Sequence, residues 1–394
     1  MPKDDINYRY TENGIVYDFY DVFVPGEYFR LPALWTWGRN NFGQLGINDA
    51  VANNRTTPVT TFAGGTNWKS VASGYAHTVA IKTDGTLWTW GYNNNGQLGI
   101  GVDVLNRTTP VTTFAGGTNW KSVAGGLYHT SAIKTDGTLW GWGINDAGQL
   151  GVNDTITRTT PVTTILGGTD WKSVAGGSNH TAAIKTDGTL WVWGYNAFGQ
   201  LGINNAADRT TPVTTFLGGT NWKSVACGRY HTTAIKTDGT LWNWGYNSYG
   251  QLGINAITIR STPVTTFLGG TNWKSVGGGI AQTTAIKTDG TLWVWGRNNN
   301  GQLGINDTAN RSTPVTTILG GTNWKSVAGG GYFITAIKTD GTLWTWGNNN
   351  LGQLGINDTT NRSTPVTTRL GGTNWKSVAG GQNHTVAIQY QPDP

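Results

Sequence analysis

The chain has 394 residues and a formal net charge of +6, and only 12% of its residues are charged. Its 21 tryptophans and 59 glycines differ from the aromatic-poor composition of disordered proteins, so the sequence predicts a folded chain. The single cysteine, Cys227, excludes an internal disulfide. No segment approaches the roughly 18–20 apolar residues of a membrane span, and the N-terminus lacks the apolar region of a secretory signal peptide.

Residues 1–33 do not recur elsewhere in the chain, carry six acidic against three basic residues, and contain eight aromatic residues. The segment Val16–Val24 alternates roughly like a strand. We predict a docking arm that attaches to a larger assembly or to a neighbouring copy by adding a strand or by burying Tyr17, Phe19, Phe23 and Phe29. The alternative is that this arm folds back and plugs its own domain.

From residue 34 onward, a unit of about fifty residues recurs seven times, with steps of 51–53 residues. Each unit contains Leu-Trp-x-Trp-Gly and Trp-Lys-Ser-Val, and these two markers account for every tryptophan in the chain. The first Trp of Leu-Trp-x-Trp-Gly recurs at Trp35, Trp88, Trp140, Trp191, Trp242, Trp293 and Trp344. We predict that these tryptophans form the core.

Each unit predicts four short strands and no helix. HTxAIK and LWxWG flank TDGT, and Asp-Gly between two alternating runs is a strong hairpin signal. PVTTF predicts an outer strand, because proline belongs at a strand edge. WKSVAGG predicts the fourth strand, after a GGTN turn.

Seven four-stranded units with short turns predict an all-β fold, a seven-bladed β-propeller of antiparallel blades over residues 34–389, followed by a tail over residues 390–394. The first LWTWG has no TDG before it, and the last HTVAIQ has none after it. We therefore predict that Leu34–Gly38 pairs with His384–Gln389, so that the two ends of the chain close the ring within one blade.

The pattern LWxWGxNxxGQLG…WKSVAxGxxHTxAIKTDG covers all seven copies and resembles the repeat of the regulator of chromosome condensation family. The resemblance implies a seven-bladed propeller but leaves the function open, because one fold hosts many functions. The founding member of that family exchanges nucleotide on a small nuclear GTPase, which depends on a wedge-like insertion, and binds chromatin. The copies here differ in length by at most two residues and leave no room for such a wedge.

A plant ultraviolet photoreceptor of the same family senses light through Trp placed after the Gly of Gly-x-x-His-Thr. None of the equivalent positions here is Trp, which argues against photoreception. They hold Tyr75, Leu127, Ser178, Arg229, Ile280, Gly331 and Gln382. A bacterial β-lactamase inhibitor of this architecture binds its target on one propeller face, and that mode needs no insertion.

The repeated polar residues predict structural rather than catalytic roles. Five histidines share one repeat position and could suggest a metal, but Gln282 and Phe333 occupy that position in the other copies. The Asp of TDG is typical of a turn, and GQLG opens no helix that could cradle a phosphate. A glutamine such as Gln200 would satisfy backbone groups of its loop. We predict no catalytic residue, metal site or cofactor, and so no enzyme.

Alternate connections of an antiparallel blade emerge on opposite faces. The TDG and GGTN connections lie on one face, nearly identical in every copy, which we call the constant face. Its repeated lysines could attract nucleic acid or an anionic envelope. The alternative is that each lysine is merely solvated or pairs with the Asp of TDG. Under this alternative, nucleic acid is an unlikely partner.

The Gly-x-x-His and GxNxxGQLG loops lie on the other face, which we call the variable face because these loops differ between copies. They are rich in Tyr, Asn, Ser and Arg, which are residues favoured in antibody paratopes. The alternative is neutral drift at exposed loops. We predict a partner-binding surface formed by Tyr75, Tyr128, Asn179, Arg229, Tyr230, Tyr246, Tyr249, Tyr332 and Gln382.

The function predicted from these observations is non-catalytic recognition or display. The Asn-, Thr- and Gly-rich, disulfide-free surface favours a location outside cells, and without a signal peptide one route there is a virion. We therefore expect a phage or viral structural or host-contact protein, on a virion or an extracellular surface, that binds a protein or a surface glycan. The alternative is an intracellular, cytoplasmic regulator that binds a small GTPase or chromatin.

Overall fold

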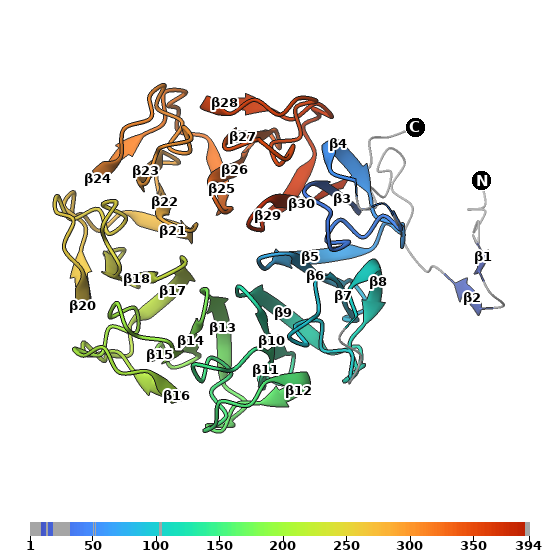
Figure 1. Ribbon diagram of the computed structural model, residues 1–394, viewed down its shortest axis with the longest axis horizontal. Coiled ribbons are helices and arrows are strands. Elements are labelled where there is room, and N and C mark those ends of the chain that lie inside the picture. Colours follow the sequence, from blue (N-terminus) through green and yellow to red (C-terminus); the bar gives the residue numbers. More distant parts are fainter. Residues whose placement is uncertain are drawn as a thin grey trace, which may run out of the picture.

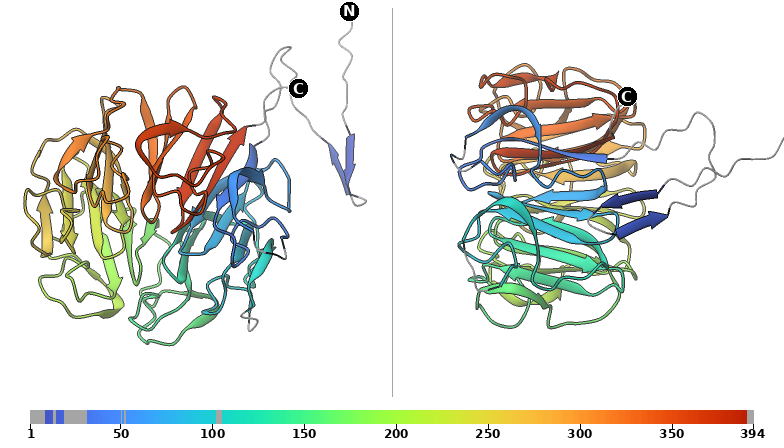
Figure 2. Two further views of the ribbon diagram at one scale, coloured as in Figure 1. Left: turned by 45° about the horizontal axis from the view of Figure 1, so that its top comes forward. Right: turned by 90° about the vertical axis from the view of Figure 1, so that its right-hand side faces the viewer.

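The computed structural model describes residues 9–12, 15–18, 32–49, 51, 53–101 and 105–390. Seven four-stranded antiparallel sheets surround a central axis as the blades of a propeller (Figure 1). The ring forms a disc with loops on both faces (Figure 2). The predicted fold class, a seven-bladed β-propeller, is therefore confirmed.

Each blade contributes its strands in the order predicted from the repeat. The inner strands are β5 (Trp68–Ser73), β9 (Trp120–Gly125), β13 (Trp171–Gly176), β17 (Trp222–Cys227), β21 (Trp273–Gly278), β25 (Trp324–Gly329) and β29 (Trp375–Gly380). The second strands are β6 (His77–Lys82), β10 (His129–Lys134), β14 (His180–Lys185), β18 (His231–Lys236), β22 (Gln282–Lys287), β26 (Phe333–Lys338) and β30 (His384–Tyr390).

The outer half of each blade is equally regular. The third strands are β3 (Pro32–Gly38), β7 (Leu87–Gly91), β11 (Leu139–Gly143), β15 (Leu190–Gly194), β19 (Leu241–Gly245), β23 (Leu292–Gly296) and β27 (Leu343–Gly347). The outer strands are β4 (Arg55–Thr60), β8 (Arg107–Thr112), β12 (Arg158–Thr163), β16 (Arg209–Thr214), β20 (Arg260–Thr265), β24 (Arg311–Thr316) and β28 (Arg362–Thr367).

The N-terminal arm contains two described strands, β1 (Arg9–Glu12) and β2 (Ile15–Asp18), which pair in an antiparallel hairpin. Tyr17 belongs to β2, whereas Phe19, Phe23 and Phe29 lie outside the described residues. The predicted docking role of residues 1–33 therefore stays a prediction.

One blade is assembled from both ends of the chain, in the order β29-β30-β3-β4. The strands β3 and β30 pair antiparallel over seven residues, from Pro32 with Tyr390 to Gly38 with His384. The predicted closure is confirmed, with two strands supplied by each end.

Tryptophan packing joins each blade to the blade before it. Trp68 and Trp90 contact each other edge to face, with ring centroids 6.2 Å apart. They lie in one apolar cluster with Leu34, Val386 and Ile388 of the preceding blade. The indole Nε1 of Trp90 donates to the carbonyl of Gln44, 3.0 Å away in the GQLG loop of that preceding blade. The second Trp of each LWxWG is therefore both an apolar and a hydrogen-bonded link between blades.

The histidines form a second link between blades. Nε2 of His77 lies 3.0 Å from the hydroxyl of Thr130 in the next blade. That hydroxyl donates to the carbonyl of Gln97, so it must accept from the histidine, which fixes the neutral Nε2–H form. Nδ1 is buried without a partner in all five histidines. Burial lowers the pKa of His77, His180 and His384 to about 3 and the pKa of His129 and His231 to about 4.

Acid should destabilise the propeller through these histidines. A histidine in the unfolded chain has a pKa of about 6.5. Below that pH the unfolded chain therefore binds protons that the folded chain excludes. The contribution of these neutral histidines to the stability of the fold is complete above the pKa of the unfolded state. It is lost as the pH falls toward the pKa of the folded state. We expect the free energy of unfolding to drop between pH 7 and pH 5, by up to about 1.4 kcal/mol per pH unit per histidine, in urea titrations.

The variant His180→Gln is the matched control, because Gln282 occupies the same position in another blade. This variant should reduce the pH dependence of the free energy of unfolding by about the contribution of one histidine. The turn aspartates, such as Asp136 and Asp187, have a pKa lowered from 3.8 by hydrogen bonds from the turn and do not titrate in this range. A free energy of unfolding independent of pH between 7 and 5 would contradict the tautomer and burial described above.

Ring closure should be essential for stability. Deleting residues 387–394 removes half of β30 and leaves part of β3 and β29 without a partner, so we expect a markedly lower melting temperature by circular dichroism. Deleting residues 8–30 removes no blade strand and should leave the melting temperature nearly unchanged. Equal tolerance of the two deletions would show that the closing pairs contribute little.

Candidate partner-binding face

At the axis of the variable face, seven backbone amides donate the hydrogen bonds that link each blade to the next. In every blade the donor is the residue after the glycine that follows the inner strand. The donors are Tyr75, Leu127, Ser178, Arg229, Ile280, Gly331 and Gln382, and the bonds are 3.0–3.3 Å long. The circle is complete, because Tyr75 donates to Leu127 and the Tyr75 carbonyl accepts from Gln382.

Glycine is required where these strands converge. A Cβ on Gly126 would lie 2.7 Å from the carbonyl oxygen of Gly177, and a Cβ on Gly228 would lie 2.6 Å from that of Gly279. Neighbouring inner strands could not approach so closely with any side chain at this position. The glycine that follows each inner strand therefore lets the ring close and fixes where the variable loops begin.

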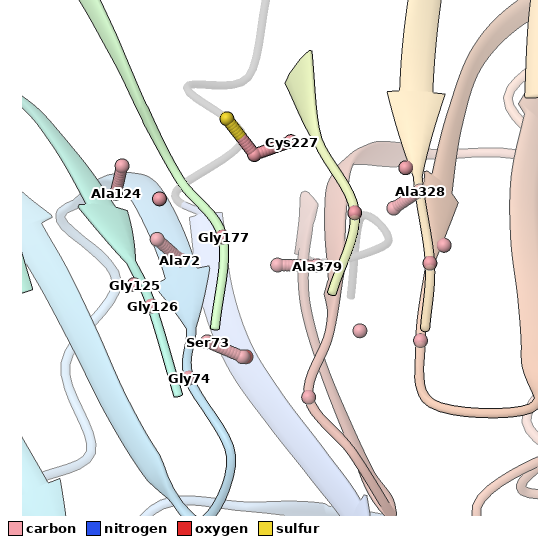
Figure 3. Close-up of a pocket in the computed structure, with 18 of the residues that line it drawn as sticks. Ala72, Ser73, Gly74, Ala124, Gly125, Gly126, Gly177, Cys227, Ala328 and Ala379 are labelled. Atoms are coloured by element: carbon pink, nitrogen blue, oxygen red, sulfur yellow. The ribbon is translucent and has the colours of Figure 1, made fainter. Parts of the chain in front are cut away.

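Below this circle, the inner strands line a cavity of about 330 Å³ along the axis (Figure 3). Its walls are mainly Val, Ala and Gly, such as Ala72, Ala124 and Ala328. The thiol of Cys227 lies 3.7 Å from the carbonyl of Ala175, and burial raises its pKa to about 12. Polar residues of the lining, such as Tyr75, Arg229 and Gln382, lie at its end toward the variable face.

Around the circle, aromatic side chains gather in two clusters. The first aromatic cluster consists of Phe42, Tyr75, Tyr92 and Tyr128, from three successive blades. Ring centroids are 4.8 Å apart for Phe42 and Tyr92, and 5.2 Å apart for Tyr75 and Tyr128. All four are half-buried, and Arg39 lies over the Phe42 ring at 5.5 Å. Burial and the two neighbouring tyrosines raise the pKa of Tyr128.

The second aromatic cluster is larger and centres on Phe198. Its ring lies 5.1 Å from that of Tyr230 and 5.0 Å from that of Tyr246. Tyr195 and Tyr249 extend the cluster on either side. The five rings are half-buried and mutually tilted, and they form one continuous apolar and hydroxyl-bearing surface.

Two arginines belong to the second aromatic cluster. The exposed Arg229 lies 5.0 Å over the ring of Tyr230. The guanidinium of Arg297 lies between the rings of Tyr249 and Tyr332, at 4.9 and 4.7 Å. No carboxylate pairs with either arginine in the described part of the chain. Both cations are held by cation–π contacts and keep hydrogen-bonding capacity for an incoming acceptor.

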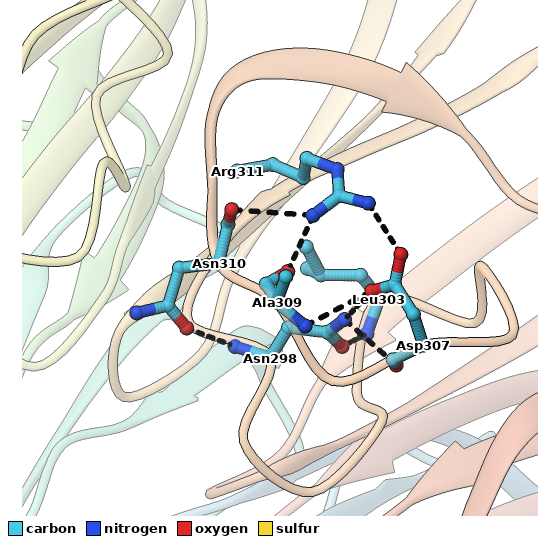
Figure 4. Close-up of polar contacts among 6 residues, drawn as sticks. All are labelled: Asn298, Leu303, Asp307, Ala309, Asn310 and Arg311. Carbon is cyan, nitrogen blue, oxygen red and sulfur yellow. Dashed lines mark hydrogen bonds and ion pairs between the residues drawn. The ribbon is translucent and has the colours of Figure 1, made fainter.

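The loops that carry these residues are held rigidly by their own polar groups (Figure 4). The buried Asn298 accepts from the backbone of Leu303 at 2.8 Å and donates to the carbonyl of Asp307 at 2.9 Å. Asp307 also pairs with Arg311. In the same way Gln200 accepts from the backbone of Phe198 at 3.0 Å, as the sequence predicted for this glutamine. The repeated Asn, Asp and Gln residues therefore orient the variable loops.

Of the residues predicted from the sequence, Tyr75 and Tyr128 lie in the first cluster, and Tyr230, Tyr246 and Tyr249 in the second. Arg229 also belongs to the second cluster, and Tyr332 adjoins it through Arg297, whereas Asn179 and Gln382 belong to neither cluster. The prediction placed further residues on this face without giving them a binding role, and the structure brings them into the clusters. They are Arg39, Phe42, Tyr92, Tyr195, Phe198 and Arg297.

Two negative observations apply to the part of the chain that the structure describes. No group of three His, Cys, Asp or Glu side chains is placed to hold a metal ion. None of the described residues forms a helix that could span a bilayer.

Comparison with known proteins places the chain among RCC1-like proteins. The sequence pattern of the RCC1-like domain matches residues 33–325, and the regulator of chromosome condensation (RCC1) repeat matches residues 324–353 and 340–388. The ultraviolet-B receptor UVR8 of Arabidopsis thaliana is 34% identical over 337 residues, which cover 84% of this chain and 76% of that protein. The human E3 ubiquitin-protein ligase HERC2 is 29% identical over 90% of this chain, but the match spans only 8% of the ligase.

Solved structures share the fold at low identity. The yeast RCC1 protein Prp20, solved in complex with Kap60, superimposes with a TM-score of 0.81 at 20% identity, over 93% of this chain and 90% of that one. Human WBSCR16 superimposes with a TM-score of 0.78 at 22% identity, over 92% of this chain and 100% of that one.

The prediction of a phage or viral protein on a virion or extracellular surface was wrong. The relatives reported above are a plant receptor, a human ubiquitin ligase and yeast RCC1, and they favour the alternative of a cellular regulator. The physical reason is that the Asn-, Thr- and Gly-rich composition is set by the loops and turns of the repeat, so it carries no information on location. Nothing in these relatives supports a surface glycan as a ligand.

The raised pKa of the Cys227 thiol, which is half-buried at the wall of the cavity, should make it unreactive, because the thiolate is the nucleophile. With a thiol-specific reagent at pH 8, we expect no modification of the folded protein and one equivalent after unfolding in urea, measured by mass spectrometry. The variant Cys227→Ser is the matched control, since Ser73 occupies this position in another blade. Rapid labelling under native conditions would mean that the thiol ionises at the cavity wall and that its pKa is not raised.

Proposed function

This chain belongs to the RCC1-like family of β-propellers, and we propose that it is a regulatory module that binds a partner protein through the second aromatic cluster of its variable face. One observation carries the proposal. Five contacting aromatic rings and two arginines without carboxylate partners form one half-exposed surface on rigid loops. Tyrosine and arginine are the residues that most often dominate binding energy at protein interfaces.

The partner class proposed is a small GTPase or a chromatin protein. Yeast Prp20, which shares this fold, has been characterised for binding to Gsp1p and histones. Nucleotide exchange by an inserted wedge is not part of the proposal, because the seven copies differ in length by at most two residues. Light sensing is not proposed either, because none of the seven residues after Gly-Gly at the axis is Trp.

The module is proposed to act by binding rather than by catalysis. Each of the five histidines is buried, and its Nε2 carries the proton that it shares with a threonine of the next blade. Such a histidine cannot act as a base toward that hydroxyl. The turn aspartates likewise accept from their own turn, as Asp187 does from Thr189 at 2.7 Å.

The test replaces Tyr230, Tyr246 and Tyr249 together by Ala. Binding to a Gsp1p-type GTPase and to histone octamers is then measured by titration calorimetry. Because each such anchor contributes about 2 kcal/mol or more, we expect at least a hundredfold loss of affinity with an unchanged melting temperature. The matched control replaces Lys172, Lys223 and Lys274 of the constant face by Ala and should bind like the unmodified chain. Retention of binding in the tyrosine variant, or binding of neither probe by the unmodified chain, would overturn the proposal.

A further inference from the structure

The constant face repeats one chemical pattern in six of its seven blades. The segment that leaves each outer strand crosses this face and enters the inner strand of the next blade, as residues 61–67 do between β4 and β5. It starts with a large apolar residue that is 54–71% exposed in six of the seven copies: Phe62, Phe114, Ile165, Phe216, Phe267 and Ile318. The next position adds a leucine that is 38–42% exposed in five copies.

The inner strand that follows this segment carries a lysine as its second residue. It is exposed in six copies, namely Lys69, Lys121, Lys172, Lys223, Lys274 and Lys325. No carboxylate lies within ion-pair distance of these six side chains in the described part of the chain. They are therefore solvated cations, arranged around the axis inside the exposed apolar residues.

The rest of the constant face does not neutralise them. Each TDG turn brings one aspartate and one preceding lysine, and these two charges cancel. That lysine lies over two tryptophan rings, as Lys134 does over Trp120 and Trp140 at 4.8 and 4.4 Å. The acid of the GGTN-type turns, Asp170, lies 3.2 Å from Lys185, the same lysine that precedes Asp187. Its charge therefore offsets that of Lys172 in this one blade, and the other blades have no such acid. The face as a whole is positive.

The symmetry of the pattern restricts what can bind it. When the same residues recur around a ring, only a flat surface of uniform chemistry or another ring can contact all of them at once. A second copy of this face is disfavoured because it would oppose lysine to lysine. A nucleic-acid duplex is a narrow rod that could cross the ring only along one line, and exposed Phe and Ile side chains contribute nothing to phosphate contacts.

We propose that the constant face binds an anionic phospholipid membrane as a peripheral surface. The lysine ring would lie over the negative headgroups, and the exposed Phe, Ile and Leu side chains would enter the boundary between headgroups and acyl chains. Because the contacts are many and rigidly arranged, individually weak interactions add up to stable attachment. This inference is independent of the protein partner proposed for the variable face.

The probe is a series of unilamellar vesicles of phosphatidylcholine with and without phosphatidylserine, and binding is measured by cosedimentation of the full chain. We expect binding to the anionic vesicles only, weakening steeply with salt because screening shortens the range of the lysine charges. Replacing Lys121, Lys172, Lys223 and Lys274 by Gln should weaken it at least a hundredfold, since each lysine near such a surface contributes about fivefold. The variant Phe114→Ser with Phe216→Ser and Phe267→Ser should weaken it about tenfold or more and raise its sensitivity to salt.

Circular dichroism melts establish that these variants fold, which is expected because all seven side chains are exposed. The matched control is the variable-face variant with Tyr230, Tyr246 and Tyr249 replaced by Ala, which should bind vesicles like the unmodified chain. Three results would overturn the proposal: no binding to anionic vesicles, binding unaffected by the lysine changes, or capture of duplex DNA in preference to vesicles when both are present.

Discussion

The packing of tryptophan between blades is the constraint on which the rest of this structure depends. The second Trp of each LWxWG contacts the inner-strand Trp of its own blade and donates to a glutamine carbonyl in the preceding blade, as Trp90 does. One side chain therefore fixes both how closely two neighbouring sheets pack and how they are rotated relative to each other. Fully burying an aromatic side chain removes about 150–250 Å² from water. Because the indole also needs its hydrogen bond, no other apolar residue would serve equally at this position.

Fixing the blades in this way separates the repeat into positions that can vary and positions that cannot. The glycine that follows each inner strand and the Asn and Gln that orient the loops are the same in every blade, because a Cβ or another side chain there would not fit the neighbouring segment. Gln282 shows that the histidine position tolerates another polar group, because its amide donates to the Gly330 carbonyl instead. By contrast, Tyr195 and Phe198 stand on a fixed loop backbone with their rings partly in solvent, so their identity is unconstrained by the fold.

The sequence predicted the fold, the blade boundaries and the closing strand pair, because each follows from a local period or from a TDG turn missing at each end. It did not predict the circle of backbone bonds at the axis or the acceptor of each histidine, since those partners lie about fifty residues away. The aromatic clusters were only partly predicted. Tyr195 and Tyr230 are 35 residues apart in the chain, and their contact depends on the angle between two blades. The location was predicted wrongly because surface composition reflects the repeat.

The two faces differ in what they could recognise, and the difference follows from the repeat itself. A face whose residues change from blade to blade presents one unique arrangement, so it can fit only one orientation of an asymmetric partner. The second aromatic cluster has this property, because its rings and arginines occur in adjacent blades on one side of the axis. A face that repeats the same lysine and the same apolar residue presents no unique orientation and can discriminate only by charge and apolarity. Such a surface suits a laterally uniform partner, which a lipid headgroup layer is and a folded protein is not. If the constant face attaches the disc to a bilayer, the variable face points away from that bilayer and remains open to a soluble partner.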